Sequence, residues 1–144
     1  MSDFLKSWFS GFEKGLKILP EEERNKLLCE CGIACSESYS LDVYKKIWYN
    51  SNSVSDFFAL LNSGFEDVSV IEVEKNTTYE IYYSTCLCDL YTQGYIKSGE
   101  FCECSRRSLL YNLNNIIPDS KVQVELVDSI LRGGEKCILR ITIE

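Results

Sequence analysis

Histidine is absent from all 144 residues of the sequence. This absence excludes Ser-His-Asp and Cys-His catalysis, His-ligated haem and zinc sites of the HExxH type. A metal in this chain would have to be held by thiolates with help from carboxylates, and thiolate-rich sites suit zinc or iron–sulfur clusters. A cysteine nucleophile would need a carboxylate such as Glu103 or Asp89, or a tyrosine, as its general base.

Positive charge is scarce as well. The chain has 15 Lys and Arg against 22 Asp and Glu, a formal net charge of −7, and no basic tail or basic helix offsets it. Because nucleic-acid binding depends on cations that neutralise phosphates, we expect no nucleic-acid partner. No apolar run approaches the roughly 20 residues that span a bilayer, and no secretory signal follows Met1, so we expect a cytoplasmic protein without membrane insertion.

Cysteine, in contrast, is abundant, with eight residues. The chain is long enough to bury a full core as one domain, so it does not need disulfides as compensating cross-links. In a reducing cytoplasm, eight cysteines favour metal-binding, catalytic or buried thiols over a disulfide framework.

Two Cys-x-Cys pairs organise the second half of the chain. The first pair, Cys86 and Cys88, follows a strand-like run, and strand alternation would put both thiols on one face. The second pair, Cys102 and Cys104, precedes a helical pattern, and helix N-termini stabilise thiolates. We expect these four cysteines, with Cys137 able to replace one, to bind one zinc ion or, as second choice, an iron–sulfur cluster. The alternative is that they are buried packing residues.

Helical spacing of apolar residues predicts four to five helices. They cover Asp3 to Ile18, a segment after Pro20, Ser40 to Asn50, a segment that Ser53 or Ser55 caps and Gly64 ends, and the residues after the second pair. In the segment after Pro20, Leu27, Cys31 and Cys35 lie one above another, and Cys29 falls on a different face. We expect Cys31 and Cys35 to face inward as packing residues, with metal ligation as the alternative. Gly32 indicates close approach of a neighbouring backbone.

Alternating β-branched and aromatic residues predict four strands. They are Val68 to Val73, Tyr79 to Cys86, Val122 to Leu131 and Cys137 to Ile143, and short turns at Lys75-Asn76 and Gly133-Gly134 make antiparallel hairpins of them. The pattern predicts a single α+β domain, with helices in residues 1–64 and an antiparallel sheet of at least four strands, plus the cysteine-rich loop and helix, in residues 65–144.

The run FCECSRRSLLYNL, followed by VQVELVDSILRGGEKCILRITI, resembles the end of domains of the 4-vinyl reductase family. The shared pattern, which runs from about Tyr83 to the end, is a cysteine before a helix, a strand rich in Val and Glu, a Gly-containing turn, a cysteine and a closing strand. This cysteine-dense version also resembles small proteins of anaerobic bacteria and proteins known as aminothiazoline-carboxylate hydrolases.

The resemblance implies an α+β ligand-binding fold that often dimerises and encloses an apolar cavity for hydrocarbon, phenolic or acyl ligands. In the aromatic-sensing members, three cysteines and a glutamate hold zinc near that cavity. One cysteine of the second pair and Cys137 match two of those ligands, whereas Ser129 and Leu126 stand at or beside the other two positions. A zinc site in this chain would therefore draw on the first pair.

Three functions remain open from the sequence. The first is a small-molecule-binding domain for an apolar or amphipathic ligand, with a largely apolar pocket between helices and sheet and with Arg106, Arg107 or Arg132 at its mouth as anchors for an acidic group. The alternative is that these arginines are simply exposed to solvent.

The second function is a hydrolase or reductase that uses Cys102 or Cys104, with a lowered pKa, as nucleophile or redox thiol. The third is a homodimeric assembly protein, because Phe4, Trp8 and Phe12 form an aromatic stripe on the first helix that something must cover.

Overall fold

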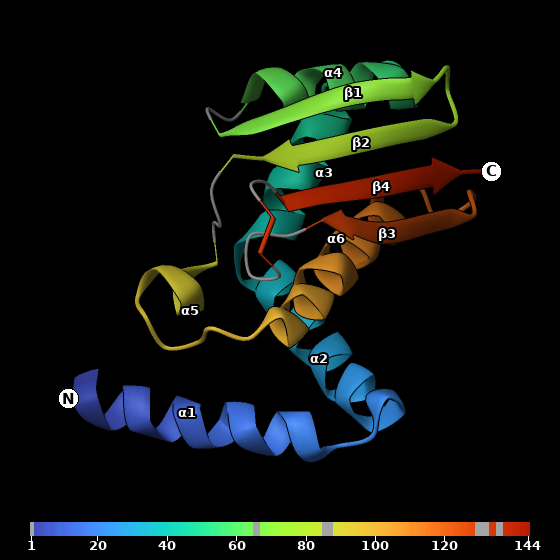
Figure 1. The fold of residues 1–144 in the computed structure, drawn as a ribbon. Helices are drawn as coiled ribbons and strands as arrows, with labels where there is room; N and C mark the ends of the chain where they lie inside the picture. The colour runs from blue at the N-terminus through green and yellow to red at the C-terminus, as the bar shows by residue number, and fades with distance from the viewer. Residues whose placement is uncertain (1, 65–66, 85–87, 129–132, 135–136) are drawn as a thin grey trace.

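Helices occupy the first half of the chain, and two antiparallel strand pairs with further helices between them form the second half (Figure 1). The structure, a computed structural model, describes residues 2–64, 67–84, 88–128, 133–134 and 137–144. Its helices are α1 (Ser2–Ile18), α2 (Glu21–Cys35), α3 (Leu41–Tyr49), α4 (Val54–Gly64), α5 (Asp89–Thr92) and α6 (Cys102–Ile116), with a π-helical turn, η1 (Ser36–Ser40), and a 3-10 turn, η2 (Gly99–Phe101). None of these described helices is both long and apolar enough to span a membrane.

The sheet has four antiparallel strands in the order β1-β2-β4-β3. The strands are β1 (Val68–Glu74), β2 (Thr78–Tyr83), β3 (Val122–Asp128) and β4 (Cys137–Ile143). Strand β2 pairs with β4 and so joins the two strand pairs into one sheet, with Ile81 opposite Leu139. The α+β class and the antiparallel sheet predicted from the sequence are confirmed.

The end of β2 differs from the prediction. Tyr83 pairs with Val68, the first residue of β1, and with Cys137, the first residue of β4, so both neighbouring strands begin at this position. Strand β2 therefore ends there rather than at Cys86, which lies outside the described residues. The prediction that Cys88 shares a strand face with Cys86 is wrong for Cys88, which precedes α5 as its N-cap residue.

The main core lies between one face of the sheet and helices α3, α4 and α6. Alternate residues of the central strands face it, and Ile81, Leu139 and Ile141 are almost completely buried. Leu109 and Leu113, one turn apart on α6, pack against them. Each fully buried side chain of this kind contributes about 1.5–3 kcal/mol, so this layer supplies much of the folding free energy.

Helices α2 and α3 are one continuous helical segment rather than two separate helices. They are joined through η1, in which the Leu41 N–H donates to the carbonyl of Ser36, five residues back. The sequence predicted a helix that starts at Ser40, because serine is a common N-cap residue. The Ser40 side chain instead accepts a hydrogen bond from Asn112 of α6 at 3.0 Å.

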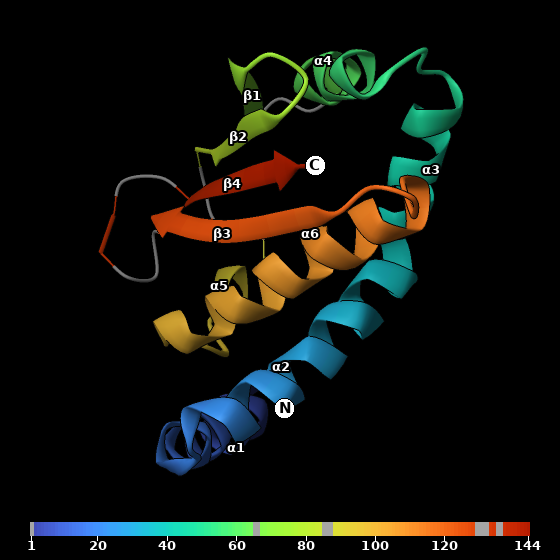
Figure 2. The same cartoon turned by 90° about the vertical axis from the view of Figure 1, so that its right-hand side faces the viewer.

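Helix α2 crosses α6 at very short range, and Figure 2 shows the two helices side by side. A Cβ at Gly32 would lie 2.7 Å from the backbone oxygen of Cys104, which confirms the close approach predicted for this glycine. One turn later, the Ser36 Oγ lies 2.6 Å from the Ser108 Oγ. Because Gly32 and Ser36 form the inner face, Cys31 and Cys35 are exposed, and the prediction that they face inward is wrong.

Helix α1 lies at the end of the molecule opposite α4 and β1 (Figure 1). Its inner face, including the buried Leu16, packs on a second apolar cluster that contains Leu28, Ile96 and Phe101. The Glu13 carboxylate also accepts a hydrogen bond from the Ser98 N–H at 2.8 Å. The aromatic stripe predicted on this helix is thus only partly covered.

Candidate functional site

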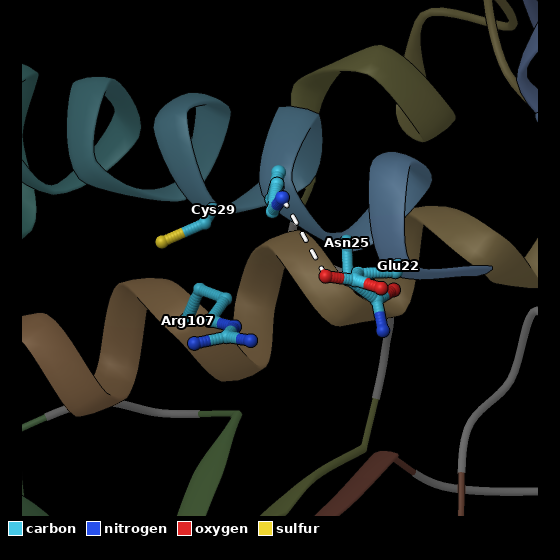
Figure 3. A pocket seen from close by; sticks show the side chains of 5 residues that line it. Glu22, Asn25, Cys29 and Arg107 are labelled. Atoms are coloured by element: carbon cyan, nitrogen blue, oxygen red, sulfur yellow. Dashed lines mark ion pairs between the residues drawn. The ribbon is translucent and has the colours of Figure 1, made fainter. Parts of the chain in front are cut away.

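A hollow of about 320 Å³ opens between α2 and α6. It is called the α2–α6 hollow below, and its lining residues are Glu22, Asn25, Lys26 and Cys29 of α2 and Arg107 of α6. Spacings of three and four residues place the α2 members on one helix face. Figure 3 shows the Cys29 sulfur and the Arg107 side chain in the space between the two helices.

Arg107 is the distinctive group of this hollow. Its Nε atom is buried and donates no hydrogen bond within the described structure. The nearest carboxylate oxygen, Oε2 of Glu103, lies 3.6 Å away, beyond good hydrogen-bond distance. Arg107 is therefore ion-paired with Glu103 without a hydrogen bond at Nε, and a buried donor left unpaired costs about 1–3 kcal/mol.

The close helix crossing explains why Arg107 sits there. Its Cβ would lie 3.0 Å from a Cβ at Gly32, so the missing side chain of Gly32 lets α6 bring the base of Arg107 against α2. The base of the side chain is therefore fixed, while 33% of the side chain remains exposed toward the hollow.

Arg106 has a different role. Its Nη1 donates to the backbone oxygen of Val124 at 2.9 Å, and its Nη2 and Nε donate to the Glu103 carboxylate. Hydrogen bonding to Glu103 raises the pKa of Arg106. Arg106 thus joins α6 to β3, and Arg132 lies outside the described residues. Of the three arginines predicted as anchors, the structure places Arg107 at a hollow.

The hollow also differs in place and character from the predicted pocket. It lies between two helices and has polar groups in its wall, including Glu22 and Lys26, which form an exposed ion pair at 3.6 Å. In the described part of the chain, core side chains pack between the helices and the sheet. The apolar pocket between helices and sheet stays a prediction.

The described cysteines occupy several environments. Cys102 is buried at the start of α6, and Cys137 is half-buried where β4 begins, opposite Tyr83. Cys88 and Cys104 are half-buried and pack against the second apolar cluster. Within the described ranges, no three Cys, Asp or Glu side chains already converge as a metal site.

Cys104 was predicted to have a lowered pKa because it lies in the first turn of a helix. Burial, followed by the charges of Cys35, Cys31, Cys88 and Glu103, instead raises the pKa of Cys104 to about 12. Desolvation and neighbouring negative groups thus act against the helix N-terminus, and a reactive thiol at this position stays a prediction.

Cys35 belongs to the same environment. Its pKa is raised by burial and by Cys88, with a smaller contribution from Asp89, although the hydrogen bond with Ser108 acts in the other direction. Cys31, Cys35 and Cys88 are thus near enough to Cys104 to influence its pKa.

Sequence reasoning did not place Cys31 and Cys35 near Cys104, and it missed the α2 residues that line the hollow. A signal was available in the run Cys31-Gly32-Ile33-Ala34-Cys35. A glycine between two thiols one turn apart marks the place where another backbone approaches, and that backbone belongs to Cys104.

Two solved structures share this fold at low sequence identity. The first is a trafficking protein particle complex subunit 3 from Naegleria fowleri covalently bound to palmitic acid, with a TM-score of 0.54, 15% identity, and coverage of 99% of this chain and 95% of that chain. The second is an H-NOX protein from S. oneidensis in the Fe(II)NO ligation state, with a TM-score of 0.54, 12% identity, and coverage of 97% and 74%. No protein-family model and no curated protein matches the sequence.

Proposed function

We propose that this chain is a small-molecule-binding domain for an amphipathic acid, whose anionic group binds Arg107 in the α2–α6 hollow. The position of Arg107, which lines the hollow with 33% of its side chain exposed, is the observation that carries the proposal. A carboxylate matches the planar fork of a guanidinium and would accept hydrogen bonds from its accessible N–H groups.

The dimensions of the hollow support this function. Its volume of about 320 Å³ lies at the lower end of the range for small-molecule sites, which is about 300–1,000 Å³. Lys26 adds a second positive charge, although Glu22 lies 3.6 Å from it. The Cys29 thiol contributes a soft, weakly polar surface beside the guanidinium.

The apolar part of the ligand is supported by two likenesses. The neighbour from Naegleria fowleri is covalently bound to palmitic acid, so a protein of this fold holds an acyl chain. The resemblance to the 4-vinyl reductase family also implies hydrocarbon, phenolic or acyl ligands. An acid with an apolar body fits both the guanidinium and these likenesses.

Calorimetric titration with palmitate, octanoate and 1-octanol tests the proposal. We expect the acids to bind and the alcohol, which has no carboxylate, to bind more weakly. Arg107→Gln should weaken acid binding on the order of 10- to 100-fold, as expected when one charge-assisted hydrogen bond is lost. Lys45→Gln removes one positive charge from an exposed position on α3 and is the matched control.

Two further comparisons show which results would contradict the proposal. Circular dichroism should show that Arg107→Gln keeps the parent fold. If the parent protein binds none of the acids, or if Arg107→Gln and Lys45→Gln bind them equally well, Arg107 is not the anchor and the proposal is wrong.

A further inference from the structure

Glu103 carries one carboxylate that two arginines share. It lies in the first turn of α6, three residues before Arg106 and four before Arg107, which is the spacing of side chains on one side of a helix. The carboxylate accepts hydrogen bonds from the Nε and Nη2 atoms of Arg106. Its Oε2 atom also lies 3.6 Å from the Nε atom of Arg107, which lines the α2–α6 hollow. An internal carboxylate therefore stands beside the guanidinium that we assign to the ligand.

The Glu103 carboxylate is held in this position. Only 14% of its side chain is exposed. Arg106, which donates to it, is itself attached to the sheet, because its Nη1 atom donates to the backbone oxygen of Val124 in β3 at 2.9 Å. Turning the carboxylate into solvent would break its hydrogen bonds and leave Arg106 without its counter-ion.

Arg107 receives the charge of Glu103 without a hydrogen bond at Nε. The Nε atom of Arg107 has no acceptor in the described structure, since 3.6 Å is beyond good hydrogen-bond distance. The Arg107 side chain is 33% exposed at the hollow. Its accessible N–H groups can therefore bind a ligand while the negative charge of Glu103 stays close to them.

The other charged groups of the hollow compensate each other. Glu22 and Lys26 of α2 form an exposed ion pair at 3.6 Å, and Asn25 is uncharged. The electrostatic balance at Arg107 therefore depends mainly on Glu103.

We propose that Glu103 is a positioning residue that acts through Arg107 and weakens the binding of acids there, an inference that rests on the small-molecule-binding function proposed above. A ligand carboxylate on Arg107 would lie close to the Glu103 carboxylate, and like charges repel each other strongly where water is partly excluded. An uncharged ligand would not meet this repulsion. Glu103 thus sets how tightly the hollow holds an acid, and Arg106 keeps Glu103 from covering the guanidinium itself.

Calorimetric titration of the full-length chain with octanoate tests this role. Glu103→Gln keeps an acceptor for Arg106 but removes the negative charge, so octanoate should bind roughly 3- to 10-fold more tightly than to the parent. Glu74→Gln removes one negative charge from an exposed position on β1 and should bind as the parent does. A substitution that merely damaged the site would weaken binding, so a gain in affinity is specific to the proposed role.

Two further measurements separate charge from shape. 1-Octanol should bind equally to the parent and to Glu103→Gln, because it carries no charge for Glu103 to repel. Glu103→Asp keeps the negative charge, and its affinity for octanoate should stay within about 3-fold of the parent.

Arg106→Gln gives a test of opposite sign. Without Arg106, the Glu103 carboxylate is free to pair fully with Arg107, so octanoate binding should weaken roughly 3- to 10-fold although Arg106 does not line the hollow. In the Glu103→Gln background the same substitution should have a much smaller effect. Arg106→Gln leaves Glu103 in place, so it tests the role even where Glu103→Gln does not fold.

The outcomes distinguish this role from the proposed function. Octanoate binding that Arg107→Gln weakens but Glu103→Gln leaves unchanged would overturn the role of Glu103 and leave the function standing. Tighter binding in Arg106→Gln would overturn it too. A parent protein that binds no acid contradicts the proposed function, and the role of Glu103 with it.

Discussion

At the scale of single residues, Gly32 controls how the molecule is assembled. Its missing side chain lets α6 approach α2 closely, and that approach sets the base of Arg107 against α2 beside the hollow.

Gly32→Ala should therefore destabilise the fold, although alanine is the better helix former. The new Cβ would meet backbone atoms of Cys104 and Ser108 at 2.7 and 3.0 Å, and backbone cannot rotate away. We expect the free energy of unfolding to fall by about 1–2 kcal/mol, as overpacking outweighs the gain in helix propensity. Unfolding in guanidinium chloride measures this free energy.

Gly15→Ala is the matched control, because a Cβ at Gly15 in α1 would have no atom within 4 Å. It should stabilise the protein by up to about 1 kcal/mol. Equal stabilisation by both substitutions would contradict the close contact at Gly32.

The tyrosine pair in the main core makes stability sensitive to high pH. Burial raises the pKa of Tyr83 to about 12, and Tyr83 is hydrogen-bonded to the buried Tyr44. A raised folded-state pKa favours the protonated form, so this contribution to stability is present below about pH 10 and is lost as pH rises toward about 12. Between about pH 9 and pH 11, the melting temperature of Tyr83→Phe should therefore fall less than that of the parent protein.

The exposed Tyr49, with 88% of its surface accessible, provides the comparison. Tyr49→Phe should show the same alkaline loss of melting temperature as the parent. An identical alkaline loss in Tyr83→Phe and Tyr49→Phe would show that Tyr83 does not titrate with unfolding.

At the scale of secondary structure, a polar side chain caps the start of helix α4. The Ser53 Oγ accepts a hydrogen bond from the Asp56 N–H at 3.0 Å. The sequence left Ser53 and Ser55 as equal candidates for this cap. Ser55 instead hydrogen-bonds to Asn76 at 2.7 Å and so connects α4 to the β1–β2 turn.

Ser53→Ala should cost about 0.5–2 kcal/mol of unfolding free energy, and Ser53→Asp should cost little, since aspartate also accepts hydrogen bonds at an N-cap. Urea unfolding is the measurement. Ser63→Ala, in the last turn of the same helix, should change stability by less than about 0.5 kcal/mol. A Ser53→Ala protein as stable as the parent would argue against the cap.

The sequence predicts a helix or strand well where contacts between residues close in the chain determine it, and poorly where contacts with distant segments do. The strands were found because alternation within each strand reports which face is buried, and β4 begins and ends where predicted. The end of β2 was missed because it depends on where β1 and β4 begin. Arg107 was proposed from charge alone, whereas the exposure of Cys31 and Cys35 was missed because it depends on Gly32 facing α6.

At the scale of the whole molecule, one surface of α1 remains uncovered. The exposed fractions of Phe4 and Trp8 are 67% and 54%, although Trp8 stacks on Phe12 at a centroid distance of 5.6 Å. Clustered exposed aromatic side chains are typical of surfaces that meet another protein. The homodimer expected from the sequence stays a prediction, and this surface is where it is to be tested.

Light scattering after size exclusion should give the parent a mass of about twice the 16.6 kDa of one chain. The double substitution Phe4→Ser and Trp8→Ser should give a monomer, because it removes the apolar surface that a second copy would bury. Tyr49→Ser, at an exposed site on α3, should leave the mass unchanged. A parent protein that is monomeric at every concentration would contradict the dimer.

The π-helical turn η1 has a geometric consequence for the long helical segment. The buried residues Leu28, Gly32, Ser36 and Tyr44 lie at multiples of four positions from one another. In a regular α-helix of roughly 100° per residue, the angular phase of such a stripe would drift by about 160° over these sixteen steps. One extra residue in a π-turn takes back about 100° of that drift, so the stripe stays on the inner side of the segment. Deletion of one residue from η1 should therefore remove the π-turn and leave Tyr44 on the inner side, because the shortened segment reaches the same angular phase as a regular α-helix.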